Sequence, residues 1–232
     1  MSELLRIATP WSGETAVRTL AGVTSHPEST PPAPSHAAPP STRATVRYKG
    51  RGHYDRELVN EILDEAVLCH VGIVQEDGSP LVLPTLFARD GDVVYIHGSP
   101  ASRLLRSAKK GIDVCLTVML LDGFVMAKSA FHHSVNYRSV VVFGTAEEVV
   151  AAEEKARALE LLVEHVHPGR SAECRAPNEK EIKSTLVLRL PLAEASAKVR
   201  TGGPIDDDED LDLPYAVGVI PVRSERGELV EH

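Results

Sequence analysis

The sequence has 232 residues, of which 43% are hydrophobic and 4% aromatic, and a formal net charge of −8. Six carboxylates lie in the segment DDDEDLD at 206–212, so the rest of the chain carries a charge of only about −2. This near-neutral remainder gives no electrostatic reason to expect nucleic-acid binding. No apolar run approaches the ~20 residues of a membrane-spanning helix, and the N-terminus lacks the apolar region of a secretory signal. We therefore expect a soluble, cytoplasmic protein.

The three cysteines, Cys69, Cys115 and Cys174, are far apart in the sequence and match no C-x-x-C motif. Cys69 and Cys115 lie inside apolar runs, so we expect them to be reduced residues of the core. Reduced cysteines are consistent with a cytoplasmic location.

Residues 1–45 are rich in Pro, Ser, Thr and Ala, as in HPESTPPAPSHAAPPSTRAT. Such a segment cannot bury enough apolar surface to offset the entropy lost on ordering, so it is interpreted as a flexible arm. An alternative is a strap along a partner subunit, with Trp11 as its anchor. Residues 46–232 form the expected folded domain, with an acidic, solvated loop at 206–212 and a last strand at 215–222.

The folded domain begins with a helix that Asp55 is placed to cap, since apolar residues recur at helical spacing in RELVNEILDEA. Helices are also predicted at about 100–110, 151–167 and 178–184. Between them lie the β-rich runs VLCHVGIV, LVLPTLFA, VVYIHG, IDVCLTVML, FVMAKSAF, YRSVVVFGTAEEV, TLVLRLPL and YAVGVIPV. The Asp-Gly pairs at 77–78, 90–91 and 122–123 predict hairpin turns. The pattern indicates an α+β, mainly β fold: a six- to seven-stranded antiparallel barrel with flanking helices.

The segment YIHGSPASRLLRSAKKG is a strand followed directly by a helix. Ser99 and Pro100 suit the start of a helix, and Ser102 and Arg103 lie in its first turn. Exposed N–H groups there, with a hydroxyl and a guanidinium beside them, would suit a phosphate. The alternative is an ordinary amphipathic helix on which Arg103 is a solvated surface residue.

Two histidines and several polar residues are concentrated in FHHSVNYRSVVVFG, at the entry to a strand. Adjacent side chains of an extended chain point apart, and no carboxylate or cysteine stands nearby at ligand spacing. The pair His165 and His167 lies at a helix end, where histidines often cap carbonyl groups. No metal site is predicted, and a surface or dimer-contact role is favoured for His132 and His133.

In this order, these pieces resemble the flavin-nucleotide-binding branch of the pyridoxamine 5′-phosphate oxidase-like family, which includes nitroimidazole-resistance proteins. The resemblance extends from about Arg51 to Val222. It includes RELVNEILDEA, LVLPTLFARDGDVVYIHGSPASRLL, VCLTV, AKSAFHHSVNYRSVVVFG, EEKARALELLVEHVHPGR, TLVLRLPLAEASAKVR and GVIPV. It implies an FMN-binding split β-barrel and a homodimer with FMN at the subunit interface.

The same resemblance implies which residues bind the cofactor. They are Pro84, Thr85, His97, Gly98, Ser102, Arg103, Asn136, Tyr137, Arg138, Ser139, Lys198 and Arg200. Ser102 and Arg103 match the phosphate-contacting positions. His97 matches a histidine near the reactive face of the flavin, so it is the expected catalytic residue in contact with substrate. Relatives often carry a tryptophan where this chain has Tyr215 and Ala216, which puts their substrate specificity in doubt here.

The expected function is that of an FMN-dependent oxidoreductase acting on a small-molecule substrate. It would transfer electrons from a reduced nicotinamide, NADH or NADPH, to a small planar acceptor. The nicotinamide would be taken up only transiently, because the chain has no G-x-G-x-x-G fingerprint. The alternative is a non-catalytic protein that binds a flavin, a deazaflavin or haem, with His132 and His133 as the suspected axial ligands of haem. A barrel without any cofactor is the third interpretation.

Overall fold

The computed structural model describes residues 37–231, which form four α-helices and ten strands. The helices are α1 (Arg56–Glu65), α2 (Arg103–Ala108), α3 (Ala152–Val166) and α4 (Glu179–Lys183). The strands are β1 (Gly52–His53), β2 (Leu68–Val74), β3 (Pro80–Asp90), β4 (Val93–Gly98), β5 (Asp113–Met126), β6 (Ser134–Thr145), β7 (Glu147–Glu148), β8 (Leu186–Pro191), β9 (Glu194–Arg200) and β10 (Gly218–Pro221). Four short 3-10 turns are η1 (Lys49–Arg51), η2 (Ala130–His132), η3 (Arg170–Glu173) and η4 (Asp208–Asp210).

All four predicted helices are present, and local capping explains where two of them begin. The Ser102 side chain accepts a hydrogen bond from the backbone N–H of Leu105 at the start of α2. Asn178 and Glu181 form a reciprocal capping box at the start of α4. Asp55 stands at the N-cap of α1, but its side chain makes no capping hydrogen bond.

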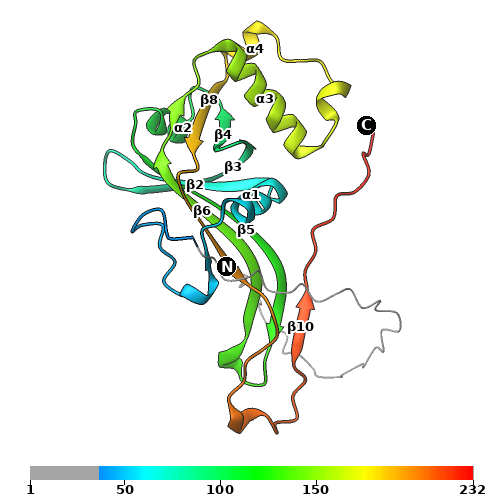
Figure 1. Ribbon diagram of the computed structural model, residues 1–232. Coiled ribbons are helices and arrows are strands. Elements are labelled where there is room, and N and C mark those ends of the chain that lie inside the picture. The colour runs from blue at the N-terminus through cyan, green and yellow to red at the C-terminus, as the bar shows by residue number, and fades with distance from the viewer. Residues whose placement is uncertain (1–36, 232) are drawn as a thin grey trace, which may run out of the picture. The chain divides into compact units, whose positions relative to one another are not determined.

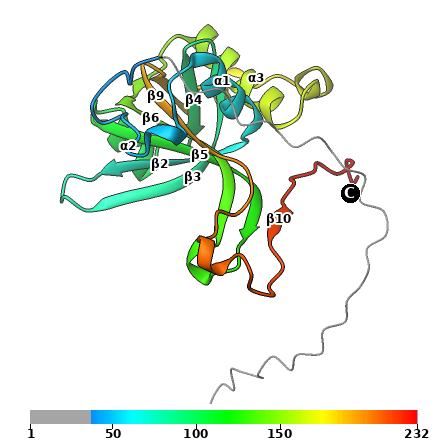
Figure 2. The ribbon, with the colours of Figure 1, turned by 60° about the horizontal axis from the view of Figure 1, so that its bottom comes forward.

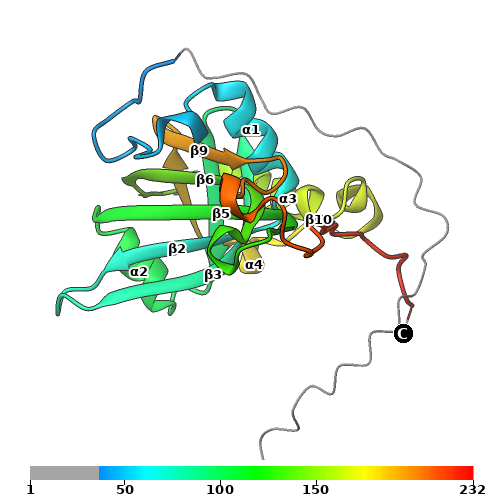
Figure 3. The ribbon, with the colours of Figure 1, turned by 90° about the horizontal axis from the view of Figure 1, so that it is seen from below.

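The strands form one antiparallel sheet in the order β1-β9-β6-β5-β2-β3-β4-β8-β7, with β10 paired to β5. Figure 3 shows β9, β6, β5, β2 and β3 side by side in this order. The sheet curls so that β8, near one end of the order, approaches β6. A Cβ added to Gly144 of β6 would lie 3.1 Å from Leu190 Cδ1 of β8, so glycine permits this approach. The expected split barrel of the α+β class is confirmed, with short strands added to the predicted set.

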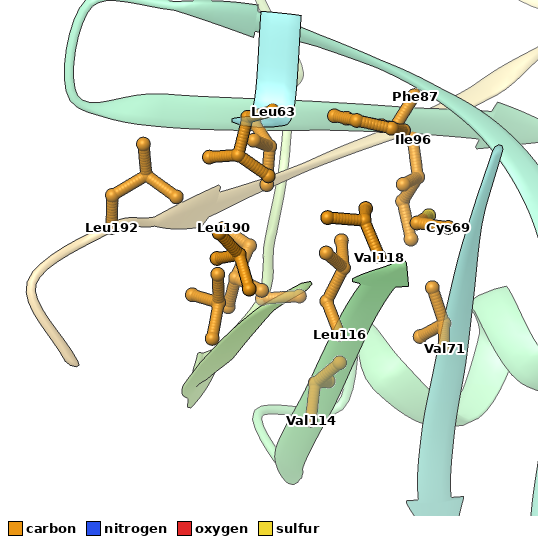
Figure 4. Close-up of a cluster of buried hydrophobic side chains, with 14 of the residues drawn as sticks. Leu63, Cys69, Val71, Phe87, Ile96, Val114, Leu116, Val118, Leu190 and Leu192 are labelled. Carbon is orange, nitrogen blue, oxygen red and sulfur yellow. The ribbon is translucent and has the colours of Figure 1, made fainter. Parts of the chain in front are cut away.

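The core lies inside this curled sheet and is closed by α1 and α2. Side chains from α1, β2, β3, β4, β5 and β8 meet there, as Figure 4 shows for Leu63, Phe87 and Leu116 among others. Cys69 is part of this core, and burial raises the pKa of its thiol to about 12. A second, smaller cluster of Tyr95, Val149, Ala158 and Val187 lies between the sheet and α3.

Strand β5 is longer than the part of it that pairs with β2. The remaining part of β5 pairs with β6, and its end also pairs with β10 (Figures 1 and 2). The prediction of a hairpin turn at Asp122-Gly123 is wrong. These residues lie inside β5, where the register with β6 shifts between Leu121 and Gly123. Gly123 is needed for close packing instead, because a Cβ there would lie 2.8 Å from Val219 Cγ1 of β10. We call this three-stranded region of β5, β6 and β10 the extension.

Two segments expected to be loosely held make specific contacts. Residues 1–36, including Trp11, lie outside the described part of the chain. At the end of the arm, Arg43 forms ion pairs with Asp113 at 3.0 Å and Glu194 at 2.6 Å. In the acidic loop, Asp206 Oδ1 accepts a hydrogen bond of 2.8 Å from the backbone N–H of Lys128. The acidic loop is therefore attached to the extension rather than only solvated.

None of the helices in residues 37–231 is both long enough and apolar enough to cross a membrane. The same residues contain no group of three or more His, Cys, Asp or Glu side chains placed to hold a metal ion.

Candidate functional site

One face of the sheet points away from the core and carries both apolar and polar side chains. In β2, Cys69, Val71 and Ile73 are buried, and His70 between them is exposed. This alternation follows from the two-residue period of a strand. The backbone register places His70 opposite Pro84 of β3 and Thr117 of β5. His70 therefore shares the outward face with Pro84, one of the expected cofactor residues.

The adjacent row continues this face from β5 across two more strands, β6 and β9. Met119 of β5 is paired with Ser139 of β6, and Ser139 is paired with Lys198 of β9. The Ser139 hydroxyl donates a hydrogen bond of 3.2 Å to the carbonyl oxygen of Lys198. The Lys198 ammonium lies 5.7 Å from the centre of the Tyr137 ring. Four expected residues, Pro84, Tyr137, Ser139 and Lys198, are thus brought together. We call the set His70, Pro84, Thr117, Met119, Ser139 and Lys198 the outer-face strip.

The outer face of the sheet also exposes large apolar side chains. Met119 of the outer-face strip is 61% exposed, and Val82 and Leu68, which lie on the same face next to the strip, are 59% and 54% exposed. Contiguous exposed apolar side chains with polar groups beside them are typical of ligand or protein contact surfaces. Lys198 adds a positive charge at one end of the outer-face strip, which favours an anionic or electron-rich ligand.

A second set of expected residues lies at α2, where Ser102 and Arg103 follow the end of β4. Arg103 and Arg106 line a cavity of about 570 Å³, together with the β2–β3 turn and the end of α2. Lys109 and Lys110 in the same wall form ion pairs with Glu148 and Glu76. Neither Arg103 nor Arg106 has a carboxylate partner within residues 37–231. Their charges can therefore meet an anion, as the sequence predicts for Arg103.

His97 is held apart from the outer-face strip. It pairs with Val187 of β8, and the strand alternation puts it on the face of Tyr95 and Val187, which pack beneath α3. Its Nδ1 is buried and has no hydrogen-bond partner, and burial lowers the pKa of the imidazole. Gly98 is packed against α2, because a Cβ there would lie 2.9 Å from Leu105 Cδ1. His70, not His97, is the histidine that shares a surface with Pro84, Ser139 and Lys198.

Asn136 and Arg200 form a third location, near the end of β9. The Arg200 guanidinium donates a hydrogen bond to Asn136 Oδ1, and Asn136 Nδ2 donates to the carbonyl oxygen of Gly202 at 3.0 Å. Both side chains are buried. A cavity opens beside them, lined by Arg200 and by two basic residues absent from the expected set, Arg51 and His53.

Two expected residues are engaged elsewhere in the described part of the chain. The Thr85 hydroxyl lies 3.4 Å from the carbonyl oxygen of Leu86. Arg138 points to the side opposite Tyr137 and Ser139, where it forms ion pairs with Glu65 of α1 and Asp122 of β5. These pairs raise the pKa of Arg138 and lower the pKa of Glu65. In this position Arg138 fastens α1 to the start of the extension.

The Arg138→Met variant should lose stability that depends on pH. The folded-state pKa of Glu65 is depressed, so the stabilisation is present above its ordinary value of 4.5 and disappears as the pH falls through the lower folded value. At pH 7 we expect a loss of about 1–2 kcal/mol, since the pair is only partly buried. Urea unfolding at pH 7 and pH 3 should show a difference between variant and wild type that shrinks at pH 3. Arg170→Met, which removes an exposed pair, is the control, and an equal loss at both pH values would contradict the assignment.

Comparison with known proteins identifies the family. Residues 55–199 match the family model described as pyridoxamine 5′-phosphate oxidase, and the chain belongs to this family. The flavocytochrome Anf3 from Azotobacter vinelandii is 45% identical, with a TM-score of 0.78, over 83% of this chain and 90% of that one. The FAD and haem binding protein from Mycobacterium smegmatis is 36% identical, with a TM-score of 0.75, over 78% of this chain and 89% of that one.

A more distant likeness supports the fold alone. A 5-nitroimidazole antibiotic resistance protein from Bacteroides thetaiotaomicron, described as putative in its structure's own name, is 24% identical with a TM-score of 0.55. The match covers 64% of this chain and 86% of that one. A search of curated proteins found no significant match.

Proposed function

We propose that this protein is a redox protein that binds both a flavin and haem. The observation that carries the proposal is the outer-face strip, a partly apolar exposed surface with a histidine toward its β3 end and a lysine at its β9 end. Support comes from the two similar structures above, one a flavocytochrome and the other an FAD and haem binding protein. Both planar groups need apolar surface with a few polar groups that fix their orientation.

The flavin would be held by two parts of the described chain. Its planar ring fits against the outer-face strip, where Lys198 and Tyr137 supply a charge and an aromatic face. Its phosphate fits the cavity of Arg103 and Arg106, whose guanidinium groups can bind phosphate oxygens through two parallel hydrogen bonds. FMN is the flavin expected from the sequence. We favour FAD, because the Mycobacterium smegmatis protein is described by that cofactor.

A histidine that binds haem iron needs a free ring nitrogen, and the haem needs apolar surface beside it. Among the described histidines, His165 Nε2 lies 2.6 Å from the carbonyl oxygen of Ala66, and its ring packs on Phe87. His132, a suspected ligand from the sequence, has its Nε2 3.1 Å from Asp207 Oδ2. Within residues 37–231 the His70 ring makes no hydrogen bond, and His70 shares the outer face with the apolar Leu68 and Pro84, so it fits the requirement best.

The second suspected ligand, His133, has a different arrangement. Its Nδ1 lies 3.0 Å from the carbonyl oxygen of Ser129, which leaves Nε2 directed outward. His133 follows the short turn η2, and the neighbouring Phe131 is 87% exposed. His133 therefore has a free nitrogen, but it lies in the turn before β6 and not on a strand, whereas His70 lies within β2. We assign the ligand to His70 and retain His133 as the comparison variant.

A bound flavin would accept a hydride and pass on single electrons, which are the two kinds of transfer an oxidoreductase of this type combines. The chain would contribute the surface that orients the flavin and excludes water, together with the charge of Lys198. We propose a reduced nicotinamide as the electron donor, since a planar donor can stack on one face of a bound flavin ring. The test is anaerobic mixing of the purified protein with NADH or NADPH, with dithionite as the reference reductant. Bleaching of the flavin bands by either nicotinamide supports the proposal, and bleaching by dithionite alone contradicts it.

We also propose that two copies of the chain associate through the extension and the outer-face strip. The extension exposes apolar side chains on all three strands and on the segment before β10. They are Phe124, Val135, Tyr215, Val219 and Ile220. Exposed apolar groups in this number favour burial against a second copy. Sedimentation equilibrium should give twice the mass of the chain, and a monomer at micromolar concentration would contradict the proposal.

A further inference from the structure

The cavity near the end of β9 contains two arginines and a histidine. It has a volume of about 360 Å³ and is lined by Arg51, His53 and Arg200, by Tyr48 and by the turn at 201–205. Arg51 ends the turn η1, and His53 lies in β1, which pairs with β9 through His53 and Ala197. The pairing of these two strands brings the three basic side chains to one end of the sheet.

Arg200 is 8% exposed, yet its hydrogen-bond partners are neutral. Its guanidinium donates to Asn136 Oδ1, to the carbonyl oxygen of Gly202 at 3.5 Å and to that of Gly203 at 3.4 Å. Gly202 has a φ of +94°, so the turn that presents these carbonyls requires glycine. A charged side chain buried to this extent is ordinarily paired with an opposite charge.

No carboxylate in residues 37–231 forms an ion pair with Arg51 or Arg200. Arg51 instead stacks on Tyr48, with its guanidinium carbon 4.9 Å from the ring centre. Asp206, which follows the turn at 201–205, is already bonded to the backbone N–H groups of Lys128 and Ser129. Burial lowers the pKa of Arg200, and the positive charge of Arg51 lowers it further. Because arginine stays charged, the two guanidinium groups repel each other across the cavity.

We propose that this cavity, which we call the Arg51–Arg200 pocket, binds the phosphate group of a small-molecule ligand. Two guanidinium forks and an imidazole N–H match the several oxygens of a phosphate and would neutralise the uncompensated charge. The Arg51–Arg200 pocket is a different cavity from the one at Arg103 and Arg106, and they share no lining residue. The phosphate could belong to a separate phosphorylated compound or to a bound flavin, and the test below distinguishes these two sources.

The test uses inorganic pyrophosphate as the probe, titrated calorimetrically at low ionic strength into the full chain as purified. Arg51→Ala is the test variant, because Arg51 is partly exposed and its loss leaves the core intact. Arg47→Ala removes an exposed positive charge four residues away, outside the pocket, and is the matched control. We expect Arg51→Ala to weaken binding by at least about tenfold and Arg47→Ala to leave it unchanged. Thermal unfolding of each variant verifies that it is folded.

The flavin retained on purification distinguishes two sources of the phosphate. If a separate phosphorylated compound occupies the pocket, the wild type binds pyrophosphate, and both variants retain as much flavin as the wild type. If the pocket holds the phosphates of a bound flavin, the purified wild type takes up no pyrophosphate, and Arg51→Ala loses flavin that Arg47→Ala retains. Both results support a phosphate pocket. The proposal is overturned if Arg51→Ala matches the wild type in both measurements, or if Arg47→Ala loses as much as Arg51→Ala.

Discussion

Replacing His70 with alanine is expected to abolish haem binding by the chain while the flavin is retained. His70 is exposed on β2, toward the β3 end of the outer-face strip, and its backbone is paired with Pro84 and Thr117. A haem iron without its imidazole ligand loses the bond that fixes it to the protein. The sharp haem absorption band of the purified protein should therefore disappear, and added haemin should not restore it. The broad flavin bands should remain, since the variant leaves Lys198, Tyr137 and the cavity at Arg103 unchanged.

Two other histidines serve as controls for this variant. His133→Ala removes a histidine with an outward Nε2, and His97→Ala removes one whose side chain lies on the α3 side of the sheet. Both variants should retain the haem band. Loss of the band in His133→Ala with its retention in His70→Ala would move the ligand to the turn at η2 and refute our assignment.

The largest effect on stability is expected for Phe87→Ala. Phe87 is 0% exposed, belongs to the main core, and contacts His165 of α3 with ring centres 5.1 Å apart. Removing a buried phenyl ring leaves a cavity, which costs about 3–5 kcal/mol of unfolding free energy. Urea unfolding should show this loss as a lower midpoint with a similar slope.

Phe131→Ala is the matched control, because Phe131 is 87% exposed and its removal leaves no cavity. We expect its free energy of unfolding to stay within about 0.5 kcal/mol of the wild type. A loss below about 1 kcal/mol for Phe87→Ala would show that the core around Phe87 is packed differently from our description.

The elements of the fold could be predicted because their signals are local. Apolar spacing predicts α1 and α3, and β-rich runs predict most of the strands. The error at Asp122-Gly123 has a tertiary cause. That glycine is required by β10, which approaches from nearly a hundred residues further along the chain, and no local pattern distinguishes this from a turn. The pairing of β1 with β9 is equally long-range and was not predicted.

The site could be predicted only in part, because resemblance names positions without saying where their side chains point. Residues 136–139 were expected to act together, but alternation along β6 puts Tyr137 and Ser139 on the outer face of the sheet and Arg138 against Glu65. His70 was missed, although its outward phase in LCHVGIV was visible in the sequence. Arg51 and His53 were missed because only strand pairing brings them to Arg200.

The central claim is that this chain binds a flavin together with haem. Its most direct test is the visible absorption spectrum of the purified protein, followed by mass analysis of the ligands released on denaturation. Our account predicts the broad bands of an oxidised flavin and the sharp band of haem in one spectrum, with a flavin nucleotide and haem in the released fraction. A colourless protein that takes up neither added flavin nor added haemin would contradict it.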